Sequence, residues 1–193
     1  MALHFSKQEF EKRKLATLKS MKEQNLDALL MFRQESMFWL TGYDTFGYVF
    51  FQTLILDQKG NIILLTRAPD LRQAQNTSNI EDIRIWVDKD QSNPTDDLKI
   101  ILNELNLKGK KIGIEYEAYG MTGRNALRLN KSLEDYCEVE DQSELITKHR
   151  VVKSTEEIVY VKKAAELADQ ALDEAWKYAK AGASEAKILA EMQ

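Results

Sequence analysis

Short apolar runs of strand length alternate with helical segments over residues 1–150. The sequence DALLMF at 27–32 is continuously apolar, which is typical of a buried central strand. Residues 48–56 and 61–66 flank a polar Asp-Gln-Lys-Gly turn, which predicts an antiparallel hairpin. Further strands are predicted at 83–87, 110–116 and 136–139, and helices from Ser6 to about Gln24, at 70–75, from Pro94 and at 122–132. This order predicts an α/β fold, a three-layer domain in which helices flank both faces of a mixed sheet.

From Ser154 onward the pattern becomes purely helical. Ser154 and Glu157 form a capping box, in which each side chain satisfies a backbone N–H at the helix start. The long helix that they begin runs toward Gly182, a typical helix end. It carries one apolar stripe: Ile158, Val161, Ala165, Leu172, Ala175 and Trp176. We therefore expect two parts, an α/β domain over 1–150 and, over 151–193, a linker with the first helices of a larger domain.

Composition excludes several classes of protein. Hydrophobic residues make up 44% of the 193-residue chain and charged residues 30%, as in a folded domain rather than a disordered segment. No apolar run approaches the roughly 20 residues of a membrane helix, and the net charge of −4 leaves no basic surface for nucleic acid. The single cysteine rules out an internal disulfide, and the first residues resemble a helix start more than a signal peptide. We expect a cytoplasmic protein that binds neither nucleic acid nor membrane.

Residues that could carry chemistry are few and scattered. The two histidines, His4 and His149, are far apart in sequence, which disfavours a metal site built on them. Glu115 and Glu117 would share one face of a strand and could hold a metal or a sugar, although a solvated strand end explains them more simply. Cys137 with His149 could form a thiol nucleophile, but a half-buried structural cysteine is the simpler interpretation. The sequence therefore predicts no catalytic and no metal-binding residue in this chain.

Aromatic side chains crowd one short stretch of the chain. Positions 38–51 hold seven of the 17 aromatic residues. They are Phe38, Trp39, Tyr43, Phe46, Tyr48, Phe50 and Phe51. Threonine, glycine and aspartate residues lie between them, which suits a bend or an exposed loop better than a core. The residues alone leave two interpretations open, a wall of the core or a surface that meets a substrate.

Four short motifs carry a resemblance to one enzyme family. They are NLDALLMFRQESMFWLTGYD at 25–44, KKIGIEYEAY at 110–119, Arg150-x-x-Lys153-Ser154-x-x-Glu157, and Ala181-Gly182-x-Ser184-Glu185. Their order and spacing resemble the N-terminal part of the creatinase, prolidase and Xaa-Pro aminopeptidase family, the pita-bread hydrolases. The resemblance covers nearly the whole chain. It implies an N-terminal domain with a ribonuclease-H-like chain path, followed by the first helices of a pita-bread catalytic domain that is truncated before its catalytic centre.

The same resemblance implies a function for the aromatic stretch. The family's catalytic domain binds two divalent metal ions (Mn, Co or Zn), usually through two Asp, one His and two Glu, which would all lie downstream of this chain. Family members pair as homodimers, and an aromatic loop of the N-terminal domain borders the partner's active site. Residues 38–40 would anchor that loop in the core. Four residues are then candidate contacts to a small-molecule or peptide substrate: Tyr43, Asp44, Phe46 and Tyr48.

Creatinase carries Phe-Gly-Arg where this chain has Phe46-Gly47-Tyr48. Tyrosine lacks the paired donors and the fixed charge of arginine, and offers a hydroxyl and a flat apolar face instead. We therefore expect the parent enzyme to cleave a C–N bond in a prolyl peptide or a cyclic solute of the ectoine type rather than in creatine. The alternative is a stand-alone protein-interaction module that has no catalytic half.

Overall fold

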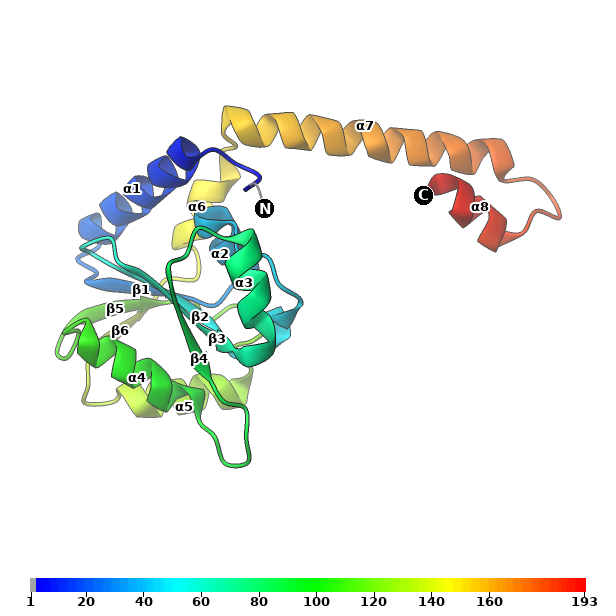
Figure 1. Ribbon diagram of the computed structural model, residues 1–193. Coiled ribbons are helices and arrows are strands. Elements are labelled where there is room, and N and C mark those ends of the chain that lie inside the picture. Colours follow the sequence, from blue (N-terminus) through cyan, green and yellow to red (C-terminus); the bar gives the residue numbers. More distant parts are fainter. Residues whose placement is uncertain (1–2) are drawn as a thin grey trace. The chain divides into compact units, whose positions relative to one another are not determined.

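One mixed sheet organises the computed structural model, which describes residues 3–193 (Figure 1). Its strands are β1 (Ala28–Met31), β2 (Thr53–Asp57), β3 (Ile62–Arg67), β4 (Asp82–Trp86), β5 (Lys111–Ile114) and β6 (Glu138–Asp141). They lie in the order β4-β3-β2-β1-β5-β6. Strands β1, β5 and β6 run parallel to one another, β2 is antiparallel to both β1 and β3, and β4 is parallel to β3. The predicted mixed sheet is confirmed.

Helices cover both faces of this sheet (Figure 1). One face packs against α1 (Lys7–Glu23), α2 (Gln34–Thr41), α3 (Leu71–Thr77) and α6 (Leu145–Val151). The other face packs against α4 (Pro94–Glu104) and α5 (Gly123–Leu133). Two short 3-10 turns, η1 (Phe46–Val49) and η2 (Ala68–Asp70), lie between these elements. The three-layer arrangement predicted from the sequence is confirmed.

The central strand β1 explains why the sheet needs helices on both sides. Ala28 and Leu30 pack into the cluster that contains α4 and α5, whereas Leu29 and Met31 pack into the cluster beneath α1 and α2. All four side chains are fully buried. Successive side chains of a strand point to opposite faces, so a continuously apolar strand is stable only when both of its faces are covered.

The structure differs from the sequence-based expectation around the aromatic stretch. Residues 34–41 form the helix α2, which was not predicted, and Gly42 ends it in the left-handed conformation with φ of +82°. The strand expected from residue 48 begins only at Thr53, because Thr45 caps the turn η1 by accepting the N–H of Gly47. The helix α6 was not predicted. Helical periodicity is weak in α2 because its eight residues mix polar and apolar side chains on most sides.

A second compact unit, Val152–Gln193, follows the first unit, Met1–Val151. It consists of α7 (Thr155–Tyr178) and α8 (Glu185–Met192). The predicted capping box is confirmed: Ser154 Oγ accepts the N–H of Glu157 at 3.2 Å, and the Glu157 carboxylate accepts the N–H of Ser154 at 2.7 Å.

The helix α7 presents its apolar stripe without a core of its own. None of its residues, all of which the structure describes, is buried. The four large stripe residues Ile158, Val161, Leu172 and Trp176 are between 38% and 75% exposed. Across residues 3–193, every helix is too short or too polar to cross a membrane.

The substitution Leu30→Ala tests whether the side chains of β1 form the core. Its side chain is fully buried on β1, opposite Ile55 of β2 and Ile114 of β5. We expect Leu30→Ala to lower the free energy of unfolding by about 2–5 kcal/mol, because it leaves a cavity. Leu127 on α5 is 75% exposed, so the control Leu127→Ala should change the free energy by less than about 0.5 kcal/mol. Urea denaturation followed by circular dichroism measures both, and equal losses would contradict the assignment.

Candidate functional site

A crevice opens at the carboxyl ends of the parallel neighbours β1 and β5. Leu30 of β1 lies opposite Ile114 of β5, so the segments that leave the two strands emerge side by side. The first segment enters α2 directly, and the second runs through residues 115–122 before α5 begins. A pocket of about 440 Å³ lies between them. Its lining residues are Arg33, Gln34, Glu35, Tyr48, Tyr116, Glu117, Ala118 and Tyr119.

Glu115 joins the two strand ends beneath this crevice. One oxygen of its fully buried carboxylate accepts the N–H groups of Phe32 and Arg33, each at 3.0 Å, and the other accepts the Ser36 hydroxyl at 2.6 Å. Burial raises the pKa of Glu115 from 4.5 to about 7, although the hydrogen bonds from Ser36 and Arg33 act in the opposite direction. The expectation of a solvated strand end is therefore wrong for Glu115.

Arg33 lies on the rim of the crevice and is held in one orientation. Its Nε donates to the carbonyl of Glu117 at 3.0 Å and its Nη2 to the carboxylate of the same residue at 2.7 Å. Its Nη1 donates to the Thr147 hydroxyl on α6 at 2.6 Å. The Glu115 and Glu117 carboxylates consequently bind different donors and do not converge on one ion. Throughout residues 3–193, no cluster of three or more His, Cys, Asp or Glu could hold a metal.

The buried Asp70 of η2 holds the aromatic loop in place. Asp70 is 4% exposed and accepts the Thr45 hydroxyl at 2.9 Å and the Arg67 guanidinium at 3.1 Å. Thr45 in turn accepts the N–H of Gly47 at 2.9 Å. The guanidinium carbon of Arg67 lies 3.4 Å from the centre of the Phe50 ring, in a cation–π contact. Both ends of η1 are thus tied to the same ion pair.

Gly47 and Gly120 allow the loop around η1 to pack closely against its neighbours, because neither residue has a side chain. A Cβ on Gly47 would lie 2.3 Å from the Asp70 carboxylate. A Cβ on Gly120 would lie 2.3 Å from the carbonyl oxygen of Phe50. The loop around η1 and the segment 115–122 therefore lie in close contact. The rings of Tyr48 and Tyr119 meet edge to face across this contact, with centroids 5.5 Å apart.

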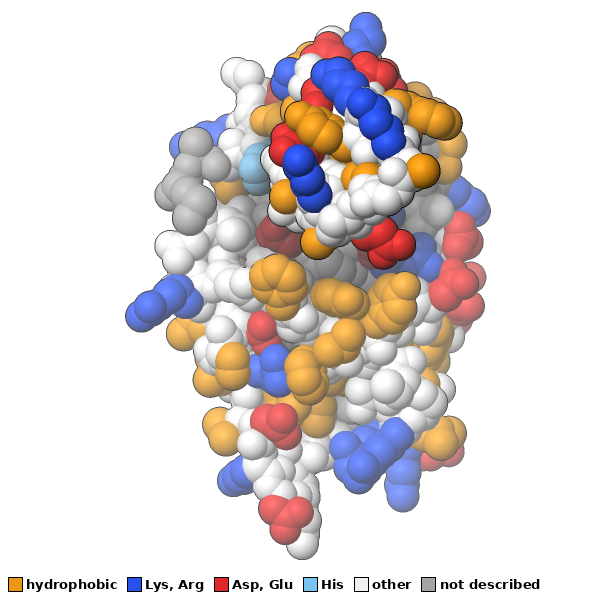
Figure 2. Space-filling view, turned by 90° about the vertical axis from the view of Figure 1, so that its right-hand side faces the viewer, with side chains coloured by type: hydrophobic (Ala, Val, Ile, Leu, Met, Phe, Trp, Pro, Cys, Tyr) orange, Lys and Arg blue, Asp and Glu red, His pale blue; other side chains and the backbone are white. Residues whose placement is uncertain are grey.

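The four predicted substrate contacts occupy different environments. Phe46 is 86% exposed, Asp44 is exposed, and Tyr48 is 38% exposed and lines the crevice. Figure 2 shows hydrophobic side chains gathered on the side of the molecule where η1 lies. Tyr43 differs: it is fully buried, and its hydroxyl donates to Gln52 at 2.8 Å. Tyr43 therefore belongs to the core, and burial raises its pKa.

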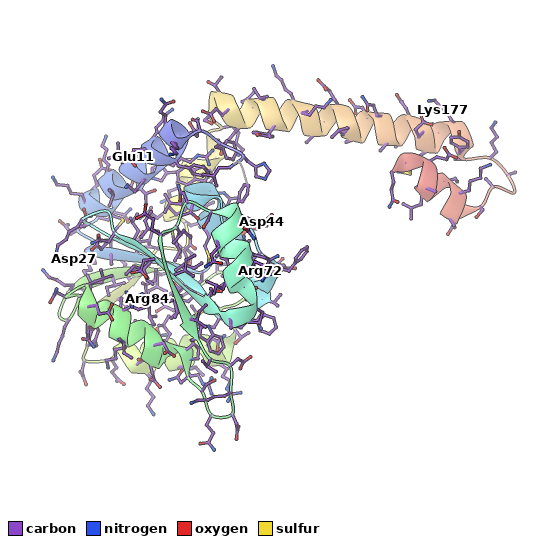
Figure 3. The ribbon with its side chains drawn as sticks, viewed as in Figure 1. Glu11, Asp27, Asp44, Arg72, Arg84 and Lys177 are labelled. Atoms are coloured by element: carbon purple, nitrogen blue, oxygen red, sulfur yellow. The ribbon has the colours of Figure 1, made fainter. Side chains whose placement is uncertain are left out.

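Asp44 lies beside α3, as Figure 3 shows together with Arg72 of that helix. The N–H of Asp44 donates to the Thr77 hydroxyl at 3.0 Å, at the C-terminal end of α3. Of residues 38–40, expected as anchors of the loop, Trp39 and Leu40 are buried and Phe38 is half-buried. The loop that carries Asp44 and the exposed aromatic side chains is thus anchored on buried residues.

The other residues considered for chemistry have structural surroundings. Cys137 is half-buried against the core, and burial raises the pKa of its thiol to about 11, which disfavours the thiolate. His149 stacks on the Trp39 ring, with centroids 5.9 Å apart, and its Nε2 lies 3.0 Å from the Ser20 hydroxyl. The predicted structural role of Cys137 fits its surroundings. Sequence reasoning missed Arg33 and Tyr119, whose only signal was their position just after a predicted strand.

A family comparison identifies the fold around this crevice. The family model described as Creatinase/Prolidase N-terminal domain matches residues 13–152. The chain belongs to this family. The resemblance noted from the sequence motifs is thereby confirmed.

Individual relatives extend the comparison beyond the matched domain. An uncharacterized hydrolase/peptidase, y4tM, of Sinorhizobium fredii is 27% identical over 195 residues, which cover 97% of this chain and 50% of that protein. Ectoine hydrolase of Halomonas elongata is 24% identical over 174 residues, which cover 86% of this chain and 43% of that protein. The prolidase of Thermococcus sibiricus shares the fold, with a TM-score of 0.75 at 20% identity over 95% of this chain and 48% of its own. The chain spans about half the length of the curated relatives it matches.

Glu115 should make the stability of the first unit depend on pH. Its pKa of about 7 in the folded chain exceeds the 4.5 of the same group in water, so the folded state holds this proton more tightly than the unfolded state. The resulting stabilisation is fully present below pH 4.5 and is lost as the pH rises through 7. As the pH rises across that window, we expect the loss of this stabilisation to lower the free energy of unfolding by on the order of 3 kcal/mol.

Urea denaturation between pH 4.5 and 8 tests this expectation on the wild type and on Glu115→Gln, whose amide does not titrate. With rising pH, the free energy of unfolding of the wild type should fall relative to that of Glu115→Gln. The control Glu134→Gln, at an exposed position, should keep a constant difference from the wild type. A curve for Glu115→Gln that also runs parallel would contradict the raised pKa.

Substitution of Gly47, with Gly123 as the control position, tests whether the turn η1 packs directly against Asp70. A methyl group at Gly47 would collide with the Asp70 carboxylate, whereas no atom lies within 4 Å of one at Gly123. Gly47→Ala should therefore lower the free energy of unfolding by about 1–3 kcal/mol, while Gly123→Ala should leave it unchanged or raise it by up to about 1 kcal/mol. Thermal and urea unfolding measure the two changes. Equal tolerance at both positions would show that Asp70 does not pack against this turn.

Proposed function

We propose that this chain is the N-terminal half of a pita-bread hydrolase that cleaves a C–N bond, and that it serves there in dimerisation and as a wall of the substrate site. The observation that carries this proposal is Phe46, which is 86% exposed at the tip of a loop held by Asp70 and Arg67. Large exposed apolar surfaces on a rigid base commonly mark interaction sites. In a homodimer this loop would meet the catalytic half of the partner.

The names of the relatives support the substrate class. They include a hydrolase/peptidase, an ectoine hydrolase and a prolidase. Phe46 and Tyr48 offer flat apolar faces to a prolyl or ectoine-like ring, and the exposed Asp44 carboxylate suits a cationic amine or amidine. A creatine-like anionic end would lack the arginine that it needs at the position of Tyr48.

Catalysis belongs to the second half of the proposed enzyme. Two divalent metal ions (Mn, Co or Zn) would activate the attacking water there, as in a metallopeptidase. The described residues 3–193 do not form a site for such ions, so no step of the reaction is assigned to them. We further propose that the enzyme is cytoplasmic. Sequencing the native gene is the first test, with about 200 further residues expected from the half-length match to the relatives.

Steady-state kinetics of the full-length protein test the loop. We expect turnover of Xaa-Pro dipeptides or ectoine, and little turnover of creatine. Phe46→Ala and Asp44→Asn should each raise KM about tenfold, which corresponds to a loss of about 1.4 kcal/mol of binding. Tyr43→Phe is the matched control: it removes a buried hydroxyl that bonds to Gln52, so it should lower stability and leave KM unchanged.

Two results would overturn the proposal. The first is efficient turnover of creatine, or unchanged kinetics in both loop variants with every good substrate. The second is a native gene that ends at Gln193, which would favour the interaction module instead.

A further inference from the structure

The crevice between β1 and β5 lies where the chain changes face. After β1 the chain enters α2, which packs on one face of the sheet through Met37 and Leu40. After β5 it proceeds to α5, which packs on the opposite face through Leu129 and Leu133. In open α/β sheets, ligands bind outside the carboxyl ends of neighbouring parallel strands whose connections leave to opposite faces. The pocket of about 440 Å³ occupies this place, and its volume is in the range of small-molecule sites.

The walls of the pocket are aromatic and fixed. Tyr48 and Tyr119 stand edge to face at 5.5 Å. The hydroxyl of Tyr116 donates to Asn130 of α5 at 2.5 Å. The rim residue Arg33 is held by three hydrogen bonds, to the carbonyl and carboxylate of Glu117 and to α6. A ligand would therefore meet an organised surface and would need to order few side chains on binding.

The charges around the pocket disfavour an anion. A helix N-terminus usually attracts negative ligands, but the buried Glu115 carboxylate already accepts the N–H groups of Phe32 and Arg33 where α2 begins. The lining residues then contribute two carboxylates, Glu35 and Glu117, against the single guanidinium of Arg33. Aromatic faces with an excess of carboxylate are the surroundings that bind organic cations.

We propose that this crevice binds a small organic cation with a flat apolar body. The body packs against the faces of Tyr48 and Tyr119, and the cationic group lies toward the carboxylate of Glu35. Arg33 does not repel the cation strongly, because its guanidinium is paired with Glu117 at 2.7 Å. This inference goes beyond the proposed function, since one copy of the chain would bind the ligand without a partner subunit.

Titration of the 193-residue chain by two-dimensional amide NMR tests the proposal with three probes that share a benzyl or phenyl body. Benzylammonium is the cation, benzyl alcohol the neutral control and benzoate the anion. We expect saturable shifts with benzylammonium at Arg33–Glu35 and Tyr116–Gly120. Benzyl alcohol should bind at least about fivefold more weakly, and benzoate should give no saturable shift at these amides.

Two variants locate the binding determinants. Tyr119 is 76% exposed, so Tyr119→Ala should preserve the fold and weaken benzylammonium about fivefold. Glu35→Gln should weaken it about threefold, and the control Glu134→Gln, at an exposed position on the far end of α5, should leave it unchanged. Thermal unfolding checks that all variants are folded. Equal binding of the three probes, saturable shifts elsewhere, or full affinity in both Tyr119→Ala and Glu35→Gln would overturn the proposal.

Discussion

The carboxylate of Glu115 connects parts of the chain that are 79 to 83 residues apart. It accepts two backbone N–H groups at the end of β1 and the hydroxyl of Ser36 in the first turn of α2. A buried N–H without a partner costs on the order of 1–3 kcal/mol, so these donors need an acceptor that β1 and α2 do not supply themselves. Glu115 therefore fixes where α2 begins and holds the end of β5 next to the first turn of that helix.

The position of α2 determines where the aromatic loop emerges. The helix ends at Gly42, whose φ of +82° favours glycine and whose Cβ would lie 2.9 Å from the carbonyl oxygen of Thr77. From there the chain passes Thr45, which bonds to Asp70, and reaches the exposed Phe46. The loop is thus defined at its start by a helix end and at its centre by an ion pair. Its two fastenings come from elements on the same face of the sheet.

Local patterns predicted the parts of the fold that local interactions determine. The apolar run at 27–32 and the capping pair Ser154 and Glu157 act within a few residues of one another, and both are present as expected. The burial of Glu115 could not be predicted in this way, because its partners are distant in sequence and a carboxylate after a strand is usually solvated. The crevice required both β1 and β5 to be placed side by side before Arg33 and Tyr119 could be seen as its walls.

The aromatic stretch divides into a buried group and an exposed group. Trp39, Tyr43 and Phe51 are buried, whereas Phe46, Tyr48 and Phe50 are exposed by 38% or more. The exposed group lies within one turn, between Thr45 and the start of β2, and the core group lies on either side of it. Because the turn is held by polar contacts to Asp70 and not by burial of Phe46 itself, a change of the Phe46 side chain alters what the surface meets and removes little from the core. The side chains exposed on this turn can therefore vary while the sheet beneath it stays the same.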